Sequence, residues 1–262
     1  MESLGTLSRR VRNEFAGRTA GLAFFGFMMS FGAALNYTVW AMNPAFESVS
    51  GKLPTAYALL LKDGLNKEGF PENSAWKKAP AISFDADWRG EHADALRTTE
   101  VRVLWNGDTL FLYFRARFRE LHIFSDARPD GWRDQLWDRD VAEAFLQPDD
   151  NDPLVYKELE VSPNGFWLDL NISHGGKEEM RSGLRRMVTQ DAEARTWTAV
   201  LGVPMRSLTP AFDPKKRWRV NFYRVEGVAE PRFYSAWSPT RSSAPNFHVP
   251  AAFGFLEFRD GL

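Results

Sequence analysis

Short apolar segments separated by turn signals constrain the fold of this chain more than any other feature of its sequence. Residues 101–105 and 110–118 flank Asn106-Gly107, the dipeptide that best fits the positive dihedral angles of a tight type I′ hairpin. Such segments recur along the chain and do not alternate with long helical patterns. The sequence therefore predicts an all-β fold, an antiparallel sandwich or barrel.

Further strands are expected from the same pattern. A second hairpin joins residues 156–161 and 166–171 through Asn164-Gly165. Residues 56–61 fit either a first strand or a short helix, and the charged segment 177–186 fits either a loop or one helical turn. The remaining expected strands are residues 141–146, 197–203, 218–224, 232–237 and 253–258.

The alternation within the strands predicts which side chains share a face. Glu143 shares a face with Val141 and Phe145, and Glu158 and Glu160 share one with Tyr156. A carboxylate buried among apolar neighbours needs a partner, because an unpaired buried charge costs several kcal/mol. That partner is either a basic side chain or the hydroxyl groups of a ligand. Faces that mix acids, arginines, amides and rings favour a ligand-binding surface over a solvated one.

Composition excludes several classes of function. The 262 residues carry 33 Lys+Arg and 34 Asp+Glu, a net charge of -1, which gives no reason to expect a nucleic acid as partner. The absence of cysteine excludes disulfides, thiolate catalysis and cysteine metal sites. Ten tryptophans are the unusual feature, since indole rings often mark places where an apolar face meets a ligand.

The N-terminal region predicts export. Residues 19–46 contain no charge, and Arg9, Arg10, Arg12 and Arg18 precede them. This pattern is typical of a signal peptide or a membrane anchor over residues 1–42, with a helix packed on the domain as the alternative. Residues 43–62 would be a linker or first strand, and residues 63–262 the β domain. A periplasmic, extracellular or membrane-anchored location follows, with any membrane contact made through this segment alone.

The mixed faces suit a sugar. A pyranose presents flat C–H patches that stack on an indole, and hydroxyls that need both donors and acceptors. Trp137 and Trp237 would stack on the ring, and Glu143 would accept hydrogen bonds. Donors would come from Arg115, Arg117 or Arg224.

The order of several motifs resembles the family 9 carbohydrate-binding modules over residues 63–258. The motifs include Trp137-x-x-Asp140-x-x-Glu143-x-Phe145, Pro163-Asn164-Gly165 and Trp237-Ser238-Pro239-Thr240. The resemblance implies a jelly-roll-like β-sandwich that binds saccharides without catalysis and serves polysaccharide breakdown beside glycoside hydrolases. It also implies that Trp137 and Trp237 clamp one sugar ring while Glu143 bonds to its hydroxyls. Tyr234 stands where members with a defined sugar site carry Asn.

The resemblance requires no cofactor, although such modules often hold structural calcium. The acidic run Asp149, Asp150 and Asp152 offers oxygen ligands for calcium. Three other functions stay open. A glycosidase would need paired carboxylates flanking the sugar, and Asp140 and Glu143 would face opposite ways on a strand. A haem-binding sandwich would need Met180, Met187 or Met205 as an axial ligand, and a scaffold or adhesion domain would need no site. The sequence leaves the oligomeric state open.

Overall fold

The computed structural model describes residues 52–125, 131–149 and 151–261. The expected export or anchor segment, residues 1–42, lies outside these ranges. Within them, the protein has no helix with the length and apolar character needed to cross a membrane. Residues 55–60 form a strand of the sheet, so the β domain begins before residue 63.

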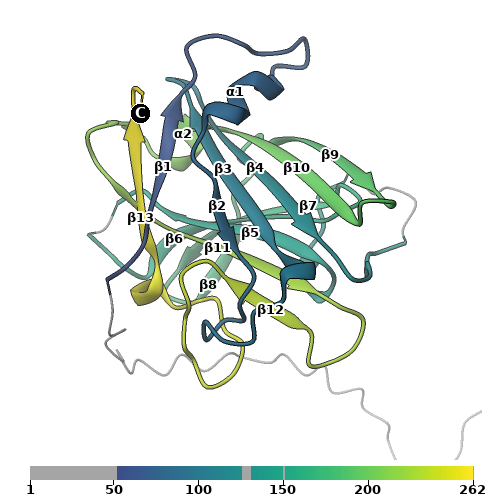
Figure 1. Cartoon of the computed structure of the whole chain (residues 1–262). Coiled ribbons are helices and arrows are strands. Elements are labelled where there is room, and N and C mark those ends of the chain that lie inside the picture. The colour runs from purple at the N-terminus through teal and green to yellow at the C-terminus, as the bar shows by residue number, and fades with distance from the viewer. Residues whose placement is uncertain (1–51, 126–130, 150, 262) are drawn as a thin grey trace, which may run out of the picture. The chain divides into compact units, whose positions relative to one another are not determined.

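One curled β-sheet forms the described domain (Figure 1), with the strand order β8-β7-β6-β5-β11-β13-β1-β3-β4-β10-β9. Two short strands lie off this path, β12 beside β11 and β2 beside β3. The strands are β1 (Thr55–Leu60), β2 (Ile82–Phe84), β3 (Thr99–Trp105), β4 (Thr109–Arg117), β5 (Val141–Gln147), β6 (Val155–Val161), β7 (Trp167–Ser173), β8 (Gly176–Glu179), β9 (Arg185–Asp191), β10 (Thr196–Pro204), β11 (Trp218–Glu226), β12 (Phe233–Ala236) and β13 (Gly254–Arg259). The short helices are α1 (Asn73–Lys78), α2 (Met205–Leu208) and the 3-10 turns η1 (Ala95–Arg97), η2 (Leu136–Asp138) and η3 (Pro250–Ala252).

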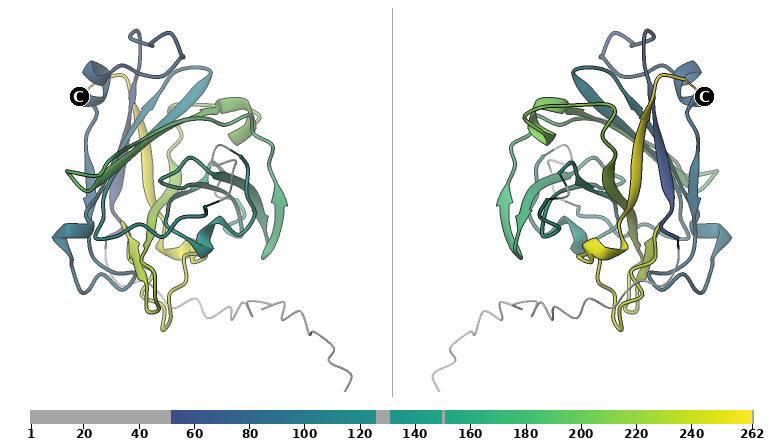
Figure 2. Two further views of the ribbon diagram at one scale, coloured as in Figure 1. Left: turned by 90° about the vertical axis from the view of Figure 1, so that its right-hand side faces the viewer. Right: turned by 90° about the vertical axis from the view of Figure 1, so that its left-hand side faces the viewer.

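The curl turns two layers of the sheet toward each other, as the side views show (Figure 2). Alternate residues of each strand point into the space between the layers and form the inner core. On β4 these are Leu110, Leu112 and Phe114, and on β5 they are Ala142 and Ala144. This alternation has the period of two that a strand with one face in the core requires.

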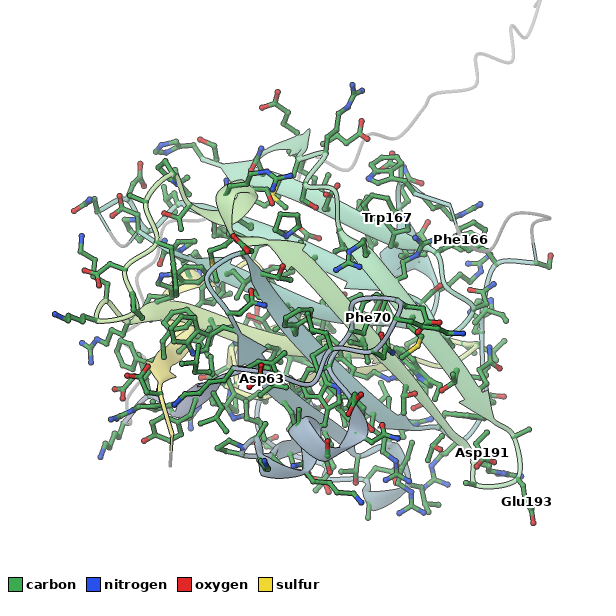
Figure 3. The ribbon with its side chains drawn as sticks, turned by 90° about the horizontal axis from the view of Figure 1, so that it is seen from above. Asp63, Phe70, Phe166, Trp167, Asp191 and Glu193 are labelled. Atoms are coloured by element: carbon green, nitrogen blue, oxygen red, sulfur yellow. The ribbon has the colours of Figure 1, made fainter. Side chains whose placement is uncertain are left out.

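Each layer also carries an apolar cluster on its outer face. One layer packs Phe111 of β4 against Phe70 and Trp76 from the segment that contains α1. Seen from above, Phe70 lies over the sheet, whereas Asp191 and Glu193 mark the far turn between β9 and β10 (Figure 3). The other layer, β5-β6-β7-β11, carries a second cluster that includes Phe145 and Tyr223. Loops cover this second cluster, and the candidate site lies there.

The sequence predicted most strands but not every connection. Both predicted hairpins are present as β3-β4 and β6-β7. The prediction of a type I′ turn at Asn106-Gly107 is wrong, because Gly107 has no positive φ. Instead, the Asn106 side-chain oxygen accepts hydrogen bonds from the backbone N–H groups of Asp108 and Thr109, at 3.0 and 2.8 Å. The asparagine therefore closes the turn with its side chain.

Two further corrections concern topology. The sheet is not purely antiparallel, because β1 runs parallel to both β13 and β3. Residues 177–186 are neither a loop nor a helical turn alone: they include part of β8 and the start of β9. Their charge misled the prediction, because both strands lie at the edges of the sheet, where most of their side chains are exposed.

Candidate functional site

Three buried glutamates meet on the outer face of the second layer. Glu143 comes from β5, and Glu158 and Glu160 come from β6. Glu143 pairs directly with Glu160 across the two strands, and Phe145 pairs with Glu158. One carboxylate oxygen from each glutamate lies within 4.8 Å of the others. We call these three residues the glutamate cluster.

The glutamate cluster lacks hydrogen-bond partners that would explain its burial. Both carboxylate oxygens of Glu160 and Oε2 of Glu158 are buried without a hydrogen-bond partner. Burial, followed by repulsion from the neighbouring carboxylates, raises the pKa of Glu143 and of Glu160 well above the usual range. The positive charge of Lys177 opposes both shifts without cancelling them. A side-chain hydrogen bond with Glu158 also raises the pKa of Glu160. The cluster therefore favours carboxyl groups that share protons over three separate negative charges.

A rim of aromatic and basic side chains lies on the same face of the sheet. Trp137, in η2, packs against the second apolar cluster and remains partly exposed. The Lys177 ammonium lies 3.9 Å from the centre of the Trp137 ring. Arg232 donates to the Trp137 carbonyl oxygen at 3.1 Å and to the Tyr234 hydroxyl at 3.0 Å. The Trp88 ring meets the Tyr234 ring edge-on at 6.4 Å.

His248 fixes the loop that covers one side of this face. Its Nδ1 lies 2.8 Å from the Tyr156 hydroxyl, and its ring lies 5.2 Å from that of Phe145. Burial lowers the pKa of His248 below its usual value. The neutral imidazole therefore packs as part of the second apolar cluster.

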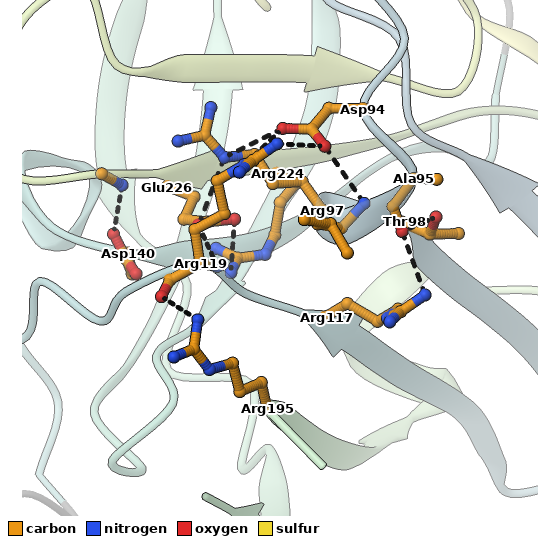
Figure 4. A network of polar contacts seen from close by, with 12 residues as sticks. Asp94, Ala95, Arg97, Thr98, Arg117, Arg119, Asp140, Arg195, Arg224 and Glu226 are labelled. Carbon is orange, nitrogen blue, oxygen red and sulfur yellow. Dashed lines mark hydrogen bonds and ion pairs between the residues drawn. The ribbon is translucent and has the colours of Figure 1, made fainter. Parts of the chain in front are cut away.

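Arg224 and Asp140 do not join Glu143. Arg224 pairs with Ala142 across the sheet, which places its side chain on the inner face. There its Nη2 lies 3.7 Å from Oε2 of Glu226 (Figure 4). Asp140 precedes β5 and accepts a hydrogen bond from the Gly227 N–H at 2.9 Å. Asp140 and Glu143 therefore lie in different surroundings, Asp140 near Arg224 and Glu143 beside Glu158.

The other predicted arginines also lie away from the glutamate cluster. Arg115 and Arg117 are exposed on the outer face of β4, in the opposite layer of the sandwich. Arg117 donates to the carbonyl oxygen of Ala95 at 3.2 Å, whereas Arg115 pairs with Glu100 across the strands. Neither side chain is brought to Trp137.

The two predicted clamp tryptophans lie on opposite faces of one layer. Trp237 packs against the inner core, with its ring 5.6 Å from that of Phe222. A Cβ atom at Gly254 would lie 2.8 Å from the Trp237 ring, so glycine is needed there for the close approach. Trp137 packs against the second cluster outside. The structure thus does not bring the two rings together around one ligand.

In the acidic run predicted for calcium, the described side chains contact nearby residues. Asp149 accepts from the Asn151 N–H at 3.0 Å, and Asp152 lies 3.0 Å from His174 Nε2. Asp150 lies outside the described residues. The described oxygens are not gathered for an ion, and calcium at this run remains a prediction.

The methionines considered for haem do not converge. Met205 is buried in the inner core, Met180 packs against it, and Met187 is exposed. They do not line one apolar pocket with a histidine or lysine.

Two hollows in the described surface lie elsewhere. The larger, of about 640 Å³, is lined by Asn164, Arg186, Gln190 and their neighbours. Figure 3 labels Phe166 and Trp167 near this part of the fold, but neither ring lines the hollow. A sugar there would lack an aromatic platform, which the rim around Trp137 provides.

A comparison with protein families shows the family of this chain. The model of carbohydrate-binding family 9 matches residues 95–258, which include the glutamate cluster, Trp137 and Trp237. The chain belongs to this family.

The chain is also similar to a relative and to solved structures. An Arthroderma benhamiae protein named "Extracellular protein" is 25% identical over 178 residues, covering 61% of this chain and 78% of the relative. A Bacteroides uniformis structure of a protein proposed to bind carbohydrate has a TM-score of 0.64 at 18% identity, over 80% of this chain and 100% of that one. A family 9 module from Caldicellulosiruptor kristjanssonii in complex with cellotriose has a TM-score of 0.56 at 11% identity, over 80% and 95%. At these identities the two structures show the fold.

Sequence reasoning missed part of the candidate site. It placed Glu158 and Glu160 on one face but did not join them to Glu143, because the pairing of β5 with β6 was unknown. The sequence did contain one signal for this site. Two strands that follow each other in the chain each carry an acid on the face that also carries large apolar side chains. Lys177 and Arg232 gave no such signal, because loops and edge strands far apart in the sequence bring them to Trp137.

Proposed function

We propose that the protein binds saccharide at the rim formed by Trp137, Lys177, Arg232 and Tyr234, with Glu143 beneath it. Family membership supports saccharide as the ligand, and the neighbours in complex with cellotriose and glucose make glucose-based sugars the first to test. The observation that carries the location is the partly exposed indole of Trp137 on the same face as buried acids that have lost water. A sugar would stack on this ring and bond to the charged groups around it.

This location revises the two-tryptophan clamp. Trp237 is partly buried and packs against the inner core beside Phe222, on the opposite face of the layer from Trp137. In the proposed site, Trp88 and Tyr234 offer a second aromatic wall near Trp137. The clamp by Trp237 stays a prediction that the same experiment tests.

We also infer that the protein is exported and assists polysaccharide breakdown. The uncharged N-terminal segment after four arginines supports export. The name of the Arthroderma relative points the same way. Detection of the full chain in periplasmic or culture fractions, against a cytoplasmic marker, tests the location.

Calorimetric titration of the full chain with glucose and cello-oligosaccharides tests the binding proposal. Reduced-end oligosaccharides are included to show whether chain ends are recognised. We expect dissociation constants between micromolar and millimolar, and at least tenfold weaker binding by Trp137→Ala, which is about 1.4 kcal/mol. Assay of the same mixtures for newly released reducing ends separates binding from hydrolysis.

Trp237→Ala is the matched control, because it removes the same side chain from the other face. Unchanged affinity in Trp137→Ala with loss in Trp237→Ala would move the site to the predicted clamp. Loss in neither variant would contradict both assignments.

A further inference from the structure

The two ends of the sheet differ in how well they are protected from pairing with another chain. An exposed strand edge presents unpaired N–H and C=O groups that can bond to a further strand. At one end, β8 has only four residues, and Lys177, Glu178 and Glu179 are exposed on it. At the other end, β9 has seven residues and pairs only with β10 in the part of the chain that the structure describes (Figure 1). The longest open edge of the described sheet is therefore that of β9.

The residues of β9 favour pairing with a further strand. Its centre, residues 187–189, contains two β-branched residues, which suit strands, and the Met187 side chain is 40% exposed. The strand lacks proline and lysine, which often protect strand edges. Its charges lie at the two ends, with Arg185 and Arg186 at the start and Asp191 at the finish. The strand therefore has an uncharged centre, a positive end and a negative end.

A hollow lies beside this edge. It has a volume of about 640 Å³, and it lies between β9 and the turn at residues 163–165. Arg186 and Gln190 of β9 donate hydrogen bonds to the carbonyl oxygens of Gly165 and Pro163 in this turn, at 2.8 and 2.9 Å. These bonds hold β9 in its extended form. The hollow leaves room for the side chains of an added strand.

We infer that two copies of this chain pair through β9, as antiparallel strands related by a two-fold axis at Val188. An axis at this central residue pairs all seven residues of the strand. It sets Arg185 of each copy opposite Asp191 of the other, and Met187 opposite Thr189. Arg185 and Asp191 are exposed on the same face of β9. Opposite charges that face each other across two strands stabilise the pairing.

The pairing makes a symmetric interface of modest strength. Each copy contributes the same edge, as in other two-fold dimers, and main-chain hydrogen bonds join the strands. One strand edge buries little surface, so we expect a dissociation constant between micromolar and millimolar. The dimer carries two copies of the rim at Trp137, which would raise the affinity for a polysaccharide. This last consequence rests on the proposed function, whereas the pairing itself does not.

Exchange of the two end charges tests the pairing. Sedimentation of the full chain from about 10 µM to 1 mM should show a concentration-dependent equilibrium between monomer and dimer. Arg185→Glu and Asp191→Arg should each weaken the dimer at least tenfold, because both symmetric pairs become repulsive. A one-to-one mixture of the two variants should associate again, since the introduced acid of one chain then lies opposite the introduced arginine of the other.

Glu178→Arg, on the edge strand β8, is the matched control. It changes the charge by the same amount as Asp191→Arg and should leave the dissociation constant of the dimer unchanged. Thermal melting checks that each variant folds. A monomer at every concentration of the unaltered chain would overturn the inference. The same conclusion follows if all variants dimerise equally, or if the mixture associates no better than either variant alone. Saccharide titration reports separately on the proposed function, because each copy has its own rim.

Discussion

The two faces of the β5-β11 layer both bury charge, but they neutralise it differently. On the inner face, Arg224 lies between acids, with Glu226 at 3.7 Å. Glu226 also accepts the backbone N–H of Arg119 at 2.9 Å and pairs with Arg97 at 3.3 Å. On the outer face, Glu143 and Glu160 face each other across β5 and β6 with no arginine between them. Alternate residues of the same strands therefore serve a balanced network and an unbalanced cluster.

This difference lies in where the opposing cation is placed. Burial raises the pKa of Glu226 and Asp140 too, yet Arg224 counters it in both cases. The inner network extends to the surface through Arg97, Asp94 and Arg119 (Figure 4). Arg224 thus places a buried cation among the inner acids, although its Nε and Nη2 atoms lack a hydrogen-bond partner. In the outer cluster the carboxyl groups lie against one another, and the cation Lys177 acts on them from the exposed edge strand β8.

Removal of Arg224 should have the largest effect on stability. Arg224→Met leaves Glu226 and Asp140 buried without their main cation, so we expect a loss of about 3–5 kcal/mol in the free energy of unfolding. Urea unfolding measures this loss. Arg115→Met, on the exposed face of β4, is the control and should stay within about 0.5 kcal/mol of the unaltered chain. A loss below 1 kcal/mol in Arg224→Met would mean that the inner acids are neutralised without the arginine.

The two tryptophans should differ in what their removal costs. Trp237→Ala removes a partly buried ring that packs against the inner core beside Phe222 and Gly254, so we expect a loss of about 2–4 kcal/mol in stability. Trp137→Ala removes a partly exposed ring and should cost about 1 kcal/mol or less in stability, with its main effect on saccharide affinity. Urea unfolding of both variants checks this order. Equal losses would show that the outer rim packs as tightly as the core.

Removal of a charge from the outer cluster should raise the stability of the protein, whereas removal of a charge from the inner network should lower it. Near pH 8, Glu160→Gln relieves repulsion from Glu143 and Glu158, and we expect stability to rise by about 1–2 kcal/mol. Glu226→Gln breaks pairs with Arg224 and Arg97 and should lower it. Chemical unfolding of both variants in one buffer compares the signs. Two losses of similar size would show that the clusters are equivalent.

The sequence predicted the strands better than the site, for a physical reason. Alternation within β4, β5 and β6 identified the apolar faces and placed Glu158 beside Glu160. It did not show that β5 pairs with β6 or that β1 lies parallel to β13. Such pairings depend on long-range packing, which the local pattern does not contain.

The predicted sugar ligands illustrate this limit residue by residue. Arg224 pairs with Ala142 across the sheet, and the preceding residue, Tyr223, pairs with Glu143. Arg224 is therefore one residue out of register with Glu143. That single step reverses the face, so the arginine enters the core and the glutamate faces the rim. Family resemblance alone could not reveal this step, because it aligns positions without their surroundings.

The surface end of the inner network should give the smallest effect, visible as a pH dependence. Hydrogen bonds from Arg119 at 2.8 and 3.0 Å hold the pKa of Asp94 below its usual value. A lowered folded-state pKa stabilises the protein above the unfolded pKa, about 3.9, and this contribution disappears as the pH falls through the folded value. Because Arg119 is half exposed, solvent screening limits the contribution to about 0.5–1 kcal/mol. Asp94→Asn should therefore be less stable by that amount at pH 7 and should approach the unaltered chain near pH 3. A difference that stays constant between these pH values would show that Asp94 acts through the turn at η1, where it also accepts the Leu96 N–H, and not through its charge.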